Sequence, residues 1–332
     1  MKKASITLSE TEKLAKASWR GRSLQDRQMQ LSKIVVMHPQ FTKAVREIRR
    51  RAERVKHQAK GGALSIVVET GGGKSTLAKF VASQHPDEHT DERTIRRCVT
   101  FCVPPRPSSV SMSSAVLRAL GDPRWNKGKT DALEERAIHL LKECRTEVIF
   151  IDNVHDVPER RARKGVREVG NWIRTLIDNV PALFVSLGAE QGLDVFKANN
   201  QARRRSPAHI RIDYFDCQTN SGIARMRRFL FEVDKQLPLA EMSEISSFDM
   251  TRRIWMATYG VPDYVIGLLT EALESAVRAR RESIEVGDLQ IAFKKLYEDA
   301  AAEINPFSPN TEIRVMNGKD EPFENWLEDG YE

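Results

Sequence analysis

Between residues 63 and 86, a β-branched run, a glycine-rich turn and a helical pattern follow one another without interruption. The run ALSIVVE (63–69) favours a strand, and KSTLAKFVASQHP (74–86) repeats apolar residues at helical spacing until Pro86 stops it. The turn GGGKS fits the pattern G-x-x-x-x-G-K-[ST], except that Val68 takes the place of the first glycine. Strand, glycine loop and helix in this order predict a P-loop α/β fold whose loop binds phosphate.

The glycine-rich turn has the residue types that suit a nucleotide phosphate. Successive backbone N–H groups of such a turn converge on phosphate oxygens, and the helix that follows adds its positive N-terminal end. We expect Lys74 to reach the β- and γ-phosphates and the Ser75 hydroxyl to bind Mg²⁺. Val68 stands where the chain leaves the strand, so this valine changes the start of the loop and not the phosphate contacts. The residues predicted to bind ATP in this segment are Thr70, Gly71, Gly72, Gly73, Lys74, Ser75 and Thr76.

A second acidic strand completes the expected site. The run VIFIDN has four apolar residues followed by Asp152, which is the form of a Walker B strand. The Asp152 carboxylate is expected to hold Mg²⁺ together with Ser75. Many ATPases place a glutamate directly after this aspartate, whereas here Asn153 occupies the position, and an amide orients water but cannot accept its proton. We therefore expect binding of ATP and Mg²⁺ with slow hydrolysis, unless Asp156 or His155 assists.

Strands alternate with helices in the first two thirds of the chain. Further strand patterns occur in RCVTFCV, ALFVSLG and HIRIDYF, and helical patterns separate them, which predicts a parallel sheet sandwiched by helices. From about Gly222 onward only helical patterns occur, which predicts a small all-helical domain. In the N-terminal part, residues 31–55 repeat apolar residues at helical spacing. The predicted boundaries are 1–62 for an N-terminal helical extension, 63–221 for the α/β domain, 222–304 for the helical domain and 305–332 for an extended acidic tail.

The composition limits the kind of protein further. A chain of 332 residues with 40% apolar and 30% charged residues can form one large or two ordinary globular domains. It has no apolar run of the roughly 18 residues that span a bilayer and no apolar secretory core at its start, so we expect a cytoplasmic protein without a membrane partner. The four cysteines have neither C-x-x-C spacing nor histidine partners at metal-ligand spacing, and we expect buried thiols. The net charge of +7 suits a polyanionic partner, although scattered cations on a solvated surface give the same sum.

Taken together, these motifs resemble the TniB/TnsC ATPases of bacterial transposons, a branch of the AAA+ superfamily. The resemblance covers about residues 30–297. It rests on GGGKSTLAKFVASQHP, on VTFCVPPRP, on ALGDPRWNKGKTDALEERAIHLLKEC leading into EVIFIDNVHDV, and on VFKANNQARRR before HIRI. The segment YGVPDYVIGLLTEALESAVRARRESIEVGDLQIAF resembles the lid of that family. The resemblance implies an AAA+ P-loop sheet followed by a helical lid.

The same resemblance implies a transposition regulator that oligomerises on double-stranded DNA, as a ring or a helical filament, when ATP is bound. Such a protein links a target selector of the TniQ or TnsD type to the transposase. An arginine just before the fifth strand is then expected to act on the γ-phosphate of a neighbouring subunit, with Arg205 and next Arg204 as candidates, beside Arg203. Ser186, near the end of the fourth strand, is the candidate sensor of the nucleotide, but the position after Gly188, where relatives often have threonine, is Ala189.

Two connecting segments are the candidate DNA contacts that the resemblance implies. They are the loop after the second strand, with Arg106, and the connector before the Walker B helix, with Lys127, Lys129 and Thr130. Basic and hydroxyl side chains that follow phosphates bind DNA without reading its sequence, and their affinity falls with salt. Ordinary solvated loops have the same residue types, and that interpretation stays open.

The last sixteen residues, NGKDEPFENWLEDGYE, combine six acids and one lysine with large apolar side chains. The apolar residues are Phe323, Trp326, Leu327 and Tyr331. This composition suits a short docking peptide for a basic partner such as the transposase. A frayed end without a role is the alternative.

Two other classes of protein share parts of the pattern. A P-loop enzyme such as a small-molecule kinase would use Lys74 and Asp152 for phosphoryl transfer, but no base for an acceptor stands out, and a basic body suits DNA better than most small acceptors. A signalling ATPase of the STAND type usually appends a long repeat-built sensor, and the chain shows no internal repeat. We therefore favour the transposition regulator, with weak or partner-stimulated ATP hydrolysis.

Overall fold

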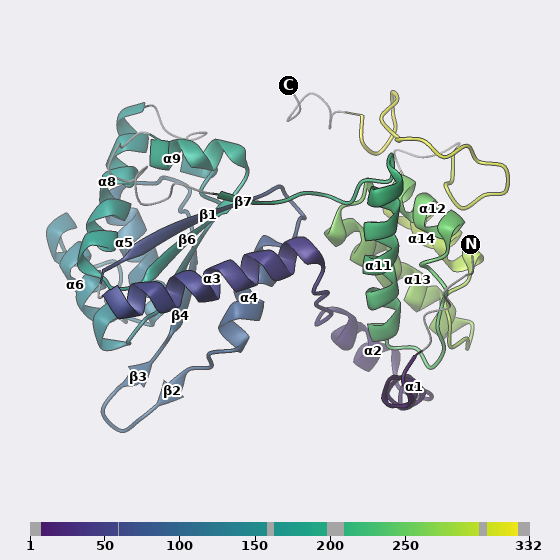
Figure 1. The fold of residues 1–332 in the computed structure, drawn as a ribbon, viewed down its shortest axis with the longest axis horizontal. Helices are drawn as coiled ribbons and strands as arrows, with labels where there is room; N and C mark the ends of the chain where they lie inside the picture. Colours follow the sequence, from purple (N-terminus) through teal and green to yellow (C-terminus); the bar gives the residue numbers. More distant parts are fainter. Residues whose placement is uncertain (1–7, 59, 158–162, 198–208, 299–303, 325–332) are drawn as a thin grey trace. The chain divides into compact units, whose positions relative to one another are not determined.

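The chain folds into two compact units in the computed structural model (Figure 1). The first unit, Pro39–Asp213, contains the sheet, and we call it the sheet unit. The second, which we call the helical unit, combines Met1–His38 with Tyr214–Glu332. The residues that the structure describes are 8–58, 60–157, 163–197, 209–298 and 304–324.

A five-stranded parallel sheet forms the centre of the sheet unit, with the strand order β4-β5-β6-β1-β7. Its strands are β1 (Gly62–Val68), β4 (Cys98–Cys102), β5 (Val148–Asp152), β6 (Leu183–Gly188) and β7 (His209–Ile212). All five coincide with predicted strand patterns. The three central strands are buried along nearly their whole length, as expected when helices cover both faces of a parallel sheet. Because parallel strands end at one edge, Val68, Asp152 and Gly188 reach the same edge of the sheet.

Helices connect the strands of the sheet unit and pack on the sheet. They are α3 (Pro39–Gln58), α4 (Lys74–Ser83), α5 (Ser109–Leu120), α6 (Thr130–Glu143), α8 (Arg163–Asn179) and α9 (Asp194–Lys197), with the short 3-10 helix η1 (Glu190–Leu193). An antiparallel hairpin of β2 (Glu88–His89) and β3 (Thr94–Ile95), which no sequence pattern predicted, follows α4. The buried indole N–H of Trp172 in α8 donates to Ser113 Oγ in α5 at 2.8 Å. The prediction of an α/β sheet sandwiched by helices is confirmed.

Six helices form the regular part of the helical unit among the described residues. They are α1 (Glu10–Ala17), α2 (Leu24–Leu31), α11 (Asn220–Gln236), α12 (Phe248–Thr258), α13 (Pro262–Arg278) and α14 (Val286–Leu296). Apolar side chains of α11 to α14 form one buried core, and Leu31 and Val36 contribute to it from the N-terminal segment, residues 8–38. This segment therefore belongs to the helical unit, and the limits of the two compact units differ from the predicted boundaries at residues 62 and 221.

The helical pattern predicted over residues 31–55 is interrupted in the structure. Helix α2 ends at Leu31, α3 begins at Pro39, and the residues between them are not helical. Proline has no backbone N–H and disfavours a helical residue before it, so a helix begins at Pro39 more easily than it runs through it. The break separates residues that pack in the helical unit from a helix that packs in the sheet unit.

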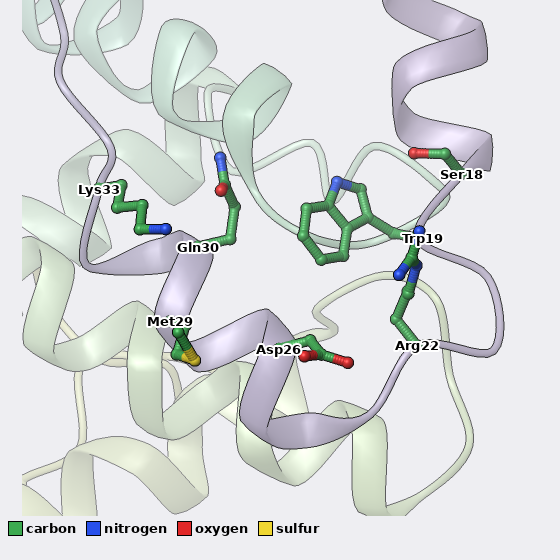
Figure 2. A pocket seen from close by; sticks show the side chains of 7 residues that line it. All are labelled: Ser18, Trp19, Arg22, Asp26, Met29, Gln30 and Lys33. Atoms are coloured by element: carbon green, nitrogen blue, oxygen red, sulfur yellow. The ribbon is translucent and has the colours of Figure 1, made fainter.

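Helices α1 and α2, with the turn between them, surround a small surface pocket of about 280 Å³ (Figure 2). Its lining combines an indole and a thioether with cations and a carboxylate. The lining residues are Ser18, Trp19, Arg22, Asp26, Met29, Gln30 and Lys33. This mixture of apolar groups and opposite charges does not define a single class of ligand.

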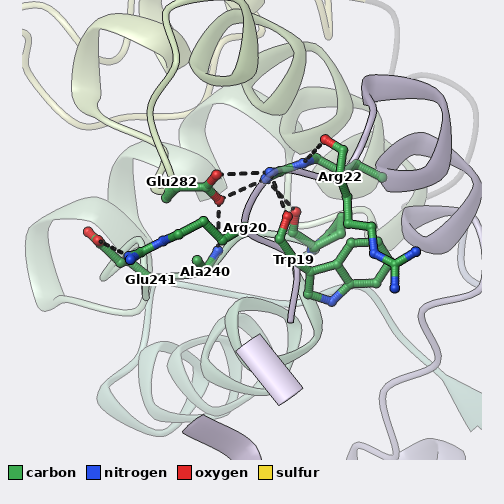
Figure 3. A network of polar contacts seen from close by, with 8 residues as sticks. Trp19, Arg20, Arg22, Ala240, Glu241 and Glu282 are labelled. Atoms are coloured by element: carbon green, nitrogen blue, oxygen red, sulfur yellow. Dashed lines mark hydrogen bonds and ion pairs between the residues drawn. The ribbon is translucent and has the colours of Figure 1, made fainter. Parts of the chain in front are cut away.

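A buried arginine, Arg27, ties the N-terminal segment to the rest of the helical unit. Figure 3 shows this network of polar contacts and labels three of the partners of Arg27, namely Trp19, Arg22 and Glu282. The Arg27 guanidinium forms a two-point ion pair with Glu282, and both N···O distances are 2.9 Å. Its N–H groups also donate to the carbonyl oxygens of Trp19, Arg22 and Pro238 at 2.7 to 3.1 Å. Every nitrogen of this side chain therefore has a partner, as a charge that is only 3% exposed requires.

Lys16 gives the N-terminal segment a second buried attachment. Its Nζ donates to the carbonyl oxygens of Asp234 and Leu237, at 2.7 and 3.3 Å, where α11 ends. A cation is favourable at the C-terminal end of a helix, whose last carbonyl groups carry partial negative charge. Burial lowers the pKa of the Lys16 ammonium, and the Asp234 carboxylate opposes this shift.

The C-terminal residues 304–324 contain no helix or strand, but they pack on the helical unit. Phe323 is 1% exposed and lies against the rings of Tyr259 and Tyr297, with centroid distances of 5.5 and 6.1 Å. The prediction that Phe323 belongs to a docking peptide is therefore wrong, because burying an aromatic ring in the protein's own core stabilises the fold. The other apolar residues of the predicted peptide lie outside the described residues; they are Trp326, Leu327 and Tyr331.

All four cysteines are free. Cys217 is buried as predicted, Cys98 and Cys144 are half-buried, and Cys102 is exposed at the end of β4. Burial raises the pKa of the Cys98 and Cys217 thiols to about 12, so both stay neutral at physiological pH. In the part of the chain that the structure describes, no three His, Cys, Asp or Glu side chains are placed to hold a metal ion, and no helix is long and apolar enough to cross a membrane.

Candidate nucleotide-binding site

Three glycines of the loop between β1 and α4 are required by its structure. Two of them have a backbone conformation that favours glycine, and the third has no room for a side chain. Gly71 and Gly73 have φ angles of 73° and 97°, in the left-handed region that other residues rarely adopt. A Cβ at Gly72 would lie 2.6 Å from Val68 Cγ1 and 3.0 Å from Glu69 O. The buried Val68 side chain thus fills the inside of the turn. The valine in place of the first glycine therefore shapes the loop itself, and its effect is not limited to the start of the loop.

Lys74, Ser75 and Asp152 lie together at the carboxyl end of the sheet. Ser75 Oγ donates to Asp152 Oδ2 at 3.3 Å, which joins the first turn of α4 to the end of β5. Lys74 Nζ, a group with three donors, donates to the carbonyl oxygen of Val68 at 3.2 Å, and this is its one hydrogen bond to the residues that the structure describes. Burial lowers the pKa of the Lys74 ammonium, and nearby carboxylates, Asp152 first among them, oppose this shift. The fold thus brings the predicted loop lysine, loop serine and Walker B aspartate into one site.

The oxygens of Ser75 and Asp152 suit a magnesium ion. Mg²⁺ prefers oxygen ligands and is usually held by one or two carboxylates together with substrate phosphates and water. The Asp152 carboxylate is 7% exposed, and its Oδ1 accepts the N–H of Asn153 at 2.9 Å while Oδ2 faces Ser75. A bound cation would compensate the charge of this nearly buried carboxylate. These two residues are therefore the ones that would hold the metal.

Asn153 adopts a left-handed backbone conformation directly after β5. Its φ angle is 59°, a conformation that asparagine tolerates better than most residues. A glutamate held in the same conformation costs roughly 1 kcal/mol. The asparagine that replaces the usual Walker B glutamate therefore matches the backbone of the turn.

The turn after Asp152 places His155 and Asp156 at the same edge of the sheet. Ala189 N donates to His155 Nδ1 at 3.3 Å, so a neutral His155 carries its proton on Nε2, which lies 3.8 Å from Asp156 Oδ1. Asp156 is nearly buried, and its charge is close enough to oppose the lowered pKa of Lys74. His155 and Asp156, which were predicted to assist hydrolysis, thus lie beside the predicted nucleotide site.

Two glycines that no motif singled out make room for this turn. A Cβ at Gly188 would lie 2.9 Å from His155 Nδ1, and a Cβ at Gly192 would lie 3.0 Å from His155 N. Val154 N donates to the carbonyl oxygen of Leu187 at 3.0 Å and fixes the turn against the end of β6. The sequence SLGAEQG is typical of an ordinary loop and does not single out these two glycines. Glycine is required at both positions only because the pairing of β5 with β6 brings the turn at His155 against them.

Ser186 lies within the sheet, two residues before β6 ends at Gly188. It pairs in register with Ile151, the residue before Asp152. Its Oγ donates to Ser65 Oγ at 3.1 Å, and both side chains are buried. The hydroxyl that was expected to sense the nucleotide is therefore bonded to the neighbouring strand β1, and its role as a sensor stays a prediction.

The three arginines expected to act on a neighbouring subunit, Arg203, Arg204 and Arg205, lie outside the described residues. The strand that follows them is described. Arg211 at its centre forms an ion pair with Glu190 of η1 at 2.5 Å. The assignment of an acting arginine stays a prediction.

The four candidate DNA contacts are exposed but do not form one cluster; they are Arg106, Lys127, Lys129 and Thr130. Arg106 lies before the start of α5, whereas the other three follow the end of this 12-residue helix, which is about 18 Å long. Arg136 holds the second loop through an ion pair with Asp122 at 2.7 Å and a hydrogen bond to the carbonyl oxygen of Lys127 at 3.2 Å. Within one chain the two segments are thus separate surfaces.

In a comparison with known families, residues 28–211 match the family described as "Bacterial TniB protein". This is more than half of the chain. No curated protein matches. The predicted resemblance to the TniB family is confirmed by this match.

Several solved structures share the fold. The ORC1 protein of Aeropyrum pernix in complex with DNA is similar with a TM-score of 0.53 and 14% identity, over 81% of this chain and 68% of that one. The ADP form of ORC2 from the same organism gives a TM-score of 0.51 and 12% identity, over 75% and 67%. Cdc6p of Pyrobaculum aerophilum gives 0.49 and 17%, and this chain spans 62% of its length. At these identities the likeness to the ORC proteins concerns the fold, and it confirms the AAA+ α/β architecture with a helical C-terminal part.

Proposed function

We propose that this chain, which belongs to the TniB family, is an ATP-dependent regulator of DNA transposition. In its ATP-bound state it oligomerises on double-stranded DNA and links a target selector of the TniQ or TnsD type to the transposase. Family and fold support the coarser statement of a nucleotide-binding ATPase associated with transposition. The observation that carries the proposal is the joint position of Lys74, Ser75 and Asp152 behind a glycine loop.

The residues of the loop account for ATP binding. The N-terminal end of α4 and the loop N–H groups attract the phosphates. Lys74 exchanges its bond to the Val68 carbonyl for bonds to phosphate oxygens, which are stronger partners for an ammonium removed from water. Ser75 and Asp152 hold Mg²⁺, which neutralises phosphate charge when it is bound.

Slow hydrolysis follows from the residue after the Walker B aspartate. Asn153 orients a water but accepts no proton, so the attacking water lacks its usual base. Asp156 is the substitute base that we propose, since it is nearly buried beside His155 and close to Lys74. ATP then acts as a lasting bridge between subunits, and turnover releases them.

Assembly on DNA draws on residues from several segments. Arg205 or Arg204 of one subunit completes the nucleotide site of the next, as the family resemblance implies. Arg106 of one loop and Lys127, Lys129 and Thr130 of the other contact DNA phosphates, and a ring or filament aligns these separate surfaces from successive subunits.

Electron microscopy of the protein with Mg²⁺, an ATP analogue and plain duplex DNA tests the proposal. Rings or filaments are expected with the unmodified chain and absent for Lys74→Ala. Lys79→Ala, an exposed lysine of the same helix, is the matched control and should assemble normally. If the unmodified chain forms no assembly on DNA, the transposition proposal is wrong.

A further inference from the structure

Helix α3 carries much of the positive charge of the chain. Its 20 residues include seven lysines and arginines and two glutamates, a net charge of +5 in a chain whose net charge is +7. The apolar side chains of α3, such as Phe41 and Ile48, are buried in the sheet unit, where the helix lies along the sheet (Figure 1). The exposed cations occupy the opposite face, with Glu53 as the one exposed carboxylate of the helix; they are Lys43, Arg46, Arg49, Arg50, Arg54 and Lys56.

Most of these cations have no acidic partner. Arg50 pairs with Glu47 at 2.7 Å, and Lys56 lies 3.7 Å from Glu147. The other four form no ion pair with any residue that the structure describes; they are Lys43, Arg46, Arg49 and Arg54. Like charges three and four residues apart repel one another on a helix. Such a face is stabilised by an anionic partner that neutralises several cations at once.

The character of the face favours a phosphate backbone over a membrane or a protein. None of the exposed large apolar side chains among the described residues belongs to α3. A helix that binds a membrane surface inserts its apolar side, but here that side is already buried in the sheet unit. Protein interfaces depend on aromatic and apolar anchors, which this face lacks. Four of its six cations are arginines, whose planar guanidinium groups match phosphate oxygens in pairs.

The length of the face also fits duplex DNA. From Lys43 to Lys56 the helix extends about 20 Å, and a duplex carries one negative charge per ~1.7 Å of its axis. Several phosphates of one duplex can therefore meet this row of cations together. No side chain of the face is bound to a carboxylate tightly enough to prevent this, apart from Arg50.

We propose that the exposed face of α3 is a DNA-binding surface separate from the two predicted loops, and that it follows duplex phosphates without reading sequence. The inference rests on the proposed binding of DNA by the assembled ATPase. It assigns a third DNA contact to each subunit, with Arg46, Arg49 and Arg54 as its main residues. Glu53, on the same face, opposes the contact.

The test compares two triple variants of the full chain with the unmodified protein, with Mg²⁺, an ATP analogue and a short fluorescein-labelled duplex. Arg46→Gln/Arg49→Gln/Arg54→Gln removes cations of α3. The control, Arg225→Gln/Arg228→Gln/Lys294→Gln, removes three exposed cations of the helical unit. The α3 variant should bind about tenfold to hundredfold more weakly, with a slope of log affinity against log salt lower by about 2 to 3, while the control changes little. Both variants should bind a fluorescent ATP analogue normally.

Glu53→Gln is a second variant, which removes a negative charge from the face of α3 and leaves all its cations in place. It should tighten DNA binding severalfold. Equal affinity and equal salt slope for the α3 variant and the unmodified protein would overturn the inference and leave the proposed function intact. Loss of binding to anionic vesicles with unchanged DNA binding would overturn it in favour of a lipid partner. If the unmodified protein binds no DNA, both proposals fail.

Discussion

Each unit contains a cation that lies beside a carboxylate, buried Arg27 in the helical unit and half-buried Lys74 in the sheet unit, and the two differ in how completely their groups are bonded. In the helical unit, the N–H groups of Arg27 are taken up by Glu282 and three carbonyl oxygens. In the sheet unit, Lys74 makes one hydrogen bond within the described part of the chain, and the hydrogen bond from Ser75 to Asp152 is long at 3.3 Å. A buried cluster that is fully bonded holds parts of the chain together. One that is partly bonded leaves donors and acceptors for a ligand.

The largest effect is expected in the fully bonded cluster. Arg27→Met leaves Glu282 without its cation, so the free energy of unfolding should fall by about 3 kcal/mol in urea titrations. The double variant Arg27→Met/Glu282→Leu should recover much of the loss. Arg20→Met, which removes an exposed arginine 3.5 Å from Glu241, is the control and should cost less than about 1 kcal/mol. Equal losses for the two single variants would contradict a structural role for Arg27.

Removing the partly bonded cation, Lys74, should weaken ATP binding and leave the stability of the fold nearly unchanged. Lys74→Ala should weaken binding of a fluorescent ATP analogue by about thirtyfold, or roughly 2 kcal/mol, because charge-assisted bonds to phosphate are lost. Its thermal stability should stay close to that of the unmodified protein, since a desolvated ammonium with one hydrogen bond contributes little to folding. A loss of stability as large as that of Arg27→Met would show that the two clusters do not differ as described.

In the sheet-unit cluster Asn153 stands where many ATPases have a glutamate base, and Asn153→Glu tests how much this replacement slows hydrolysis. The variant should hydrolyse ATP at least about tenfold faster, because a positioned carboxylate accepts the proton of the attacking water. It should unfold about 1 kcal/mol more easily, because of the left-handed backbone at this position. Asn153→Ala, which supplies no base, is the control for turnover. Unchanged turnover in Asn153→Glu would mean that Asp156 or another group already acts as a base as effective as the usual glutamate, and would contradict slow hydrolysis.

Packing inside the loop should matter less than its charges. Gly72→Ala places a methyl group 2.6 Å from Val68 Cγ1, and this crowding should weaken ATP binding by about 1 kcal/mol, or roughly fivefold. Adding Val68→Gly to the same chain should restore the affinity, since it removes the atom in conflict. If the double variant binds no better than Gly72→Ala alone, Val68 is not what requires glycine at position 72. Titration with a fluorescent ATP analogue measures the affinity of the unmodified protein, of Gly72→Ala and of the double variant.

The smallest expected effect is a change of the stability difference between the unmodified protein and Arg27→Met at acidic pH. Hydrogen bonds from Arg27 hold the pKa of Glu282 below its ordinary value. A carboxyl with a lowered folded pKa contributes stability that is present above its unfolded pKa, about 4.3, and is lost as the pH falls through the folded value. Urea titrations below about pH 4 should therefore show a narrowing gap between the unmodified protein and Arg27→Met. A gap that stays constant down to pH 2 would mean that Glu282 is not the linked group.

Local sequence patterns predicted the strands and the nucleotide loop of the sheet unit. Most features that they did not predict depend on contacts between segments that are distant in the sequence. β-branched runs gave all five strands of the sheet, and the spacing of Gly73, Lys74 and Ser75 gave the nucleotide loop. The requirement for Gly188 could not be read from the sequence, because it depends on how the turn at His155 packs against β6.

The sequence patterns also did not predict which segments form each compact unit, because this depends on contacts between distant residues. Arg27 and Glu282 are 255 positions apart, and neither carries a motif, so their ion pair could not be foreseen. Phe323 lies in an acidic stretch that is typical of a tail, but it is buried against the aromatic rings of Tyr259, Tyr264 and Tyr297. Pro39 did carry a signal for the break between the units, since proline favours the first turn of a helix.

The sheet unit is inserted into the sequence of the helical unit, and this fixes an order of events during synthesis. The chain passes into the sheet unit at Pro39 and leaves it at Asp213, whose carboxylate accepts a hydrogen bond from Gln40 at 3.0 Å. On the ribosome, Arg27 is translated before the sheet unit, but Glu282 is translated after it. Domains tend to fold as they emerge. The N-terminal segment must therefore stay hydrated while the whole sheet unit is made, and the helical unit closes only when its last helices have been translated.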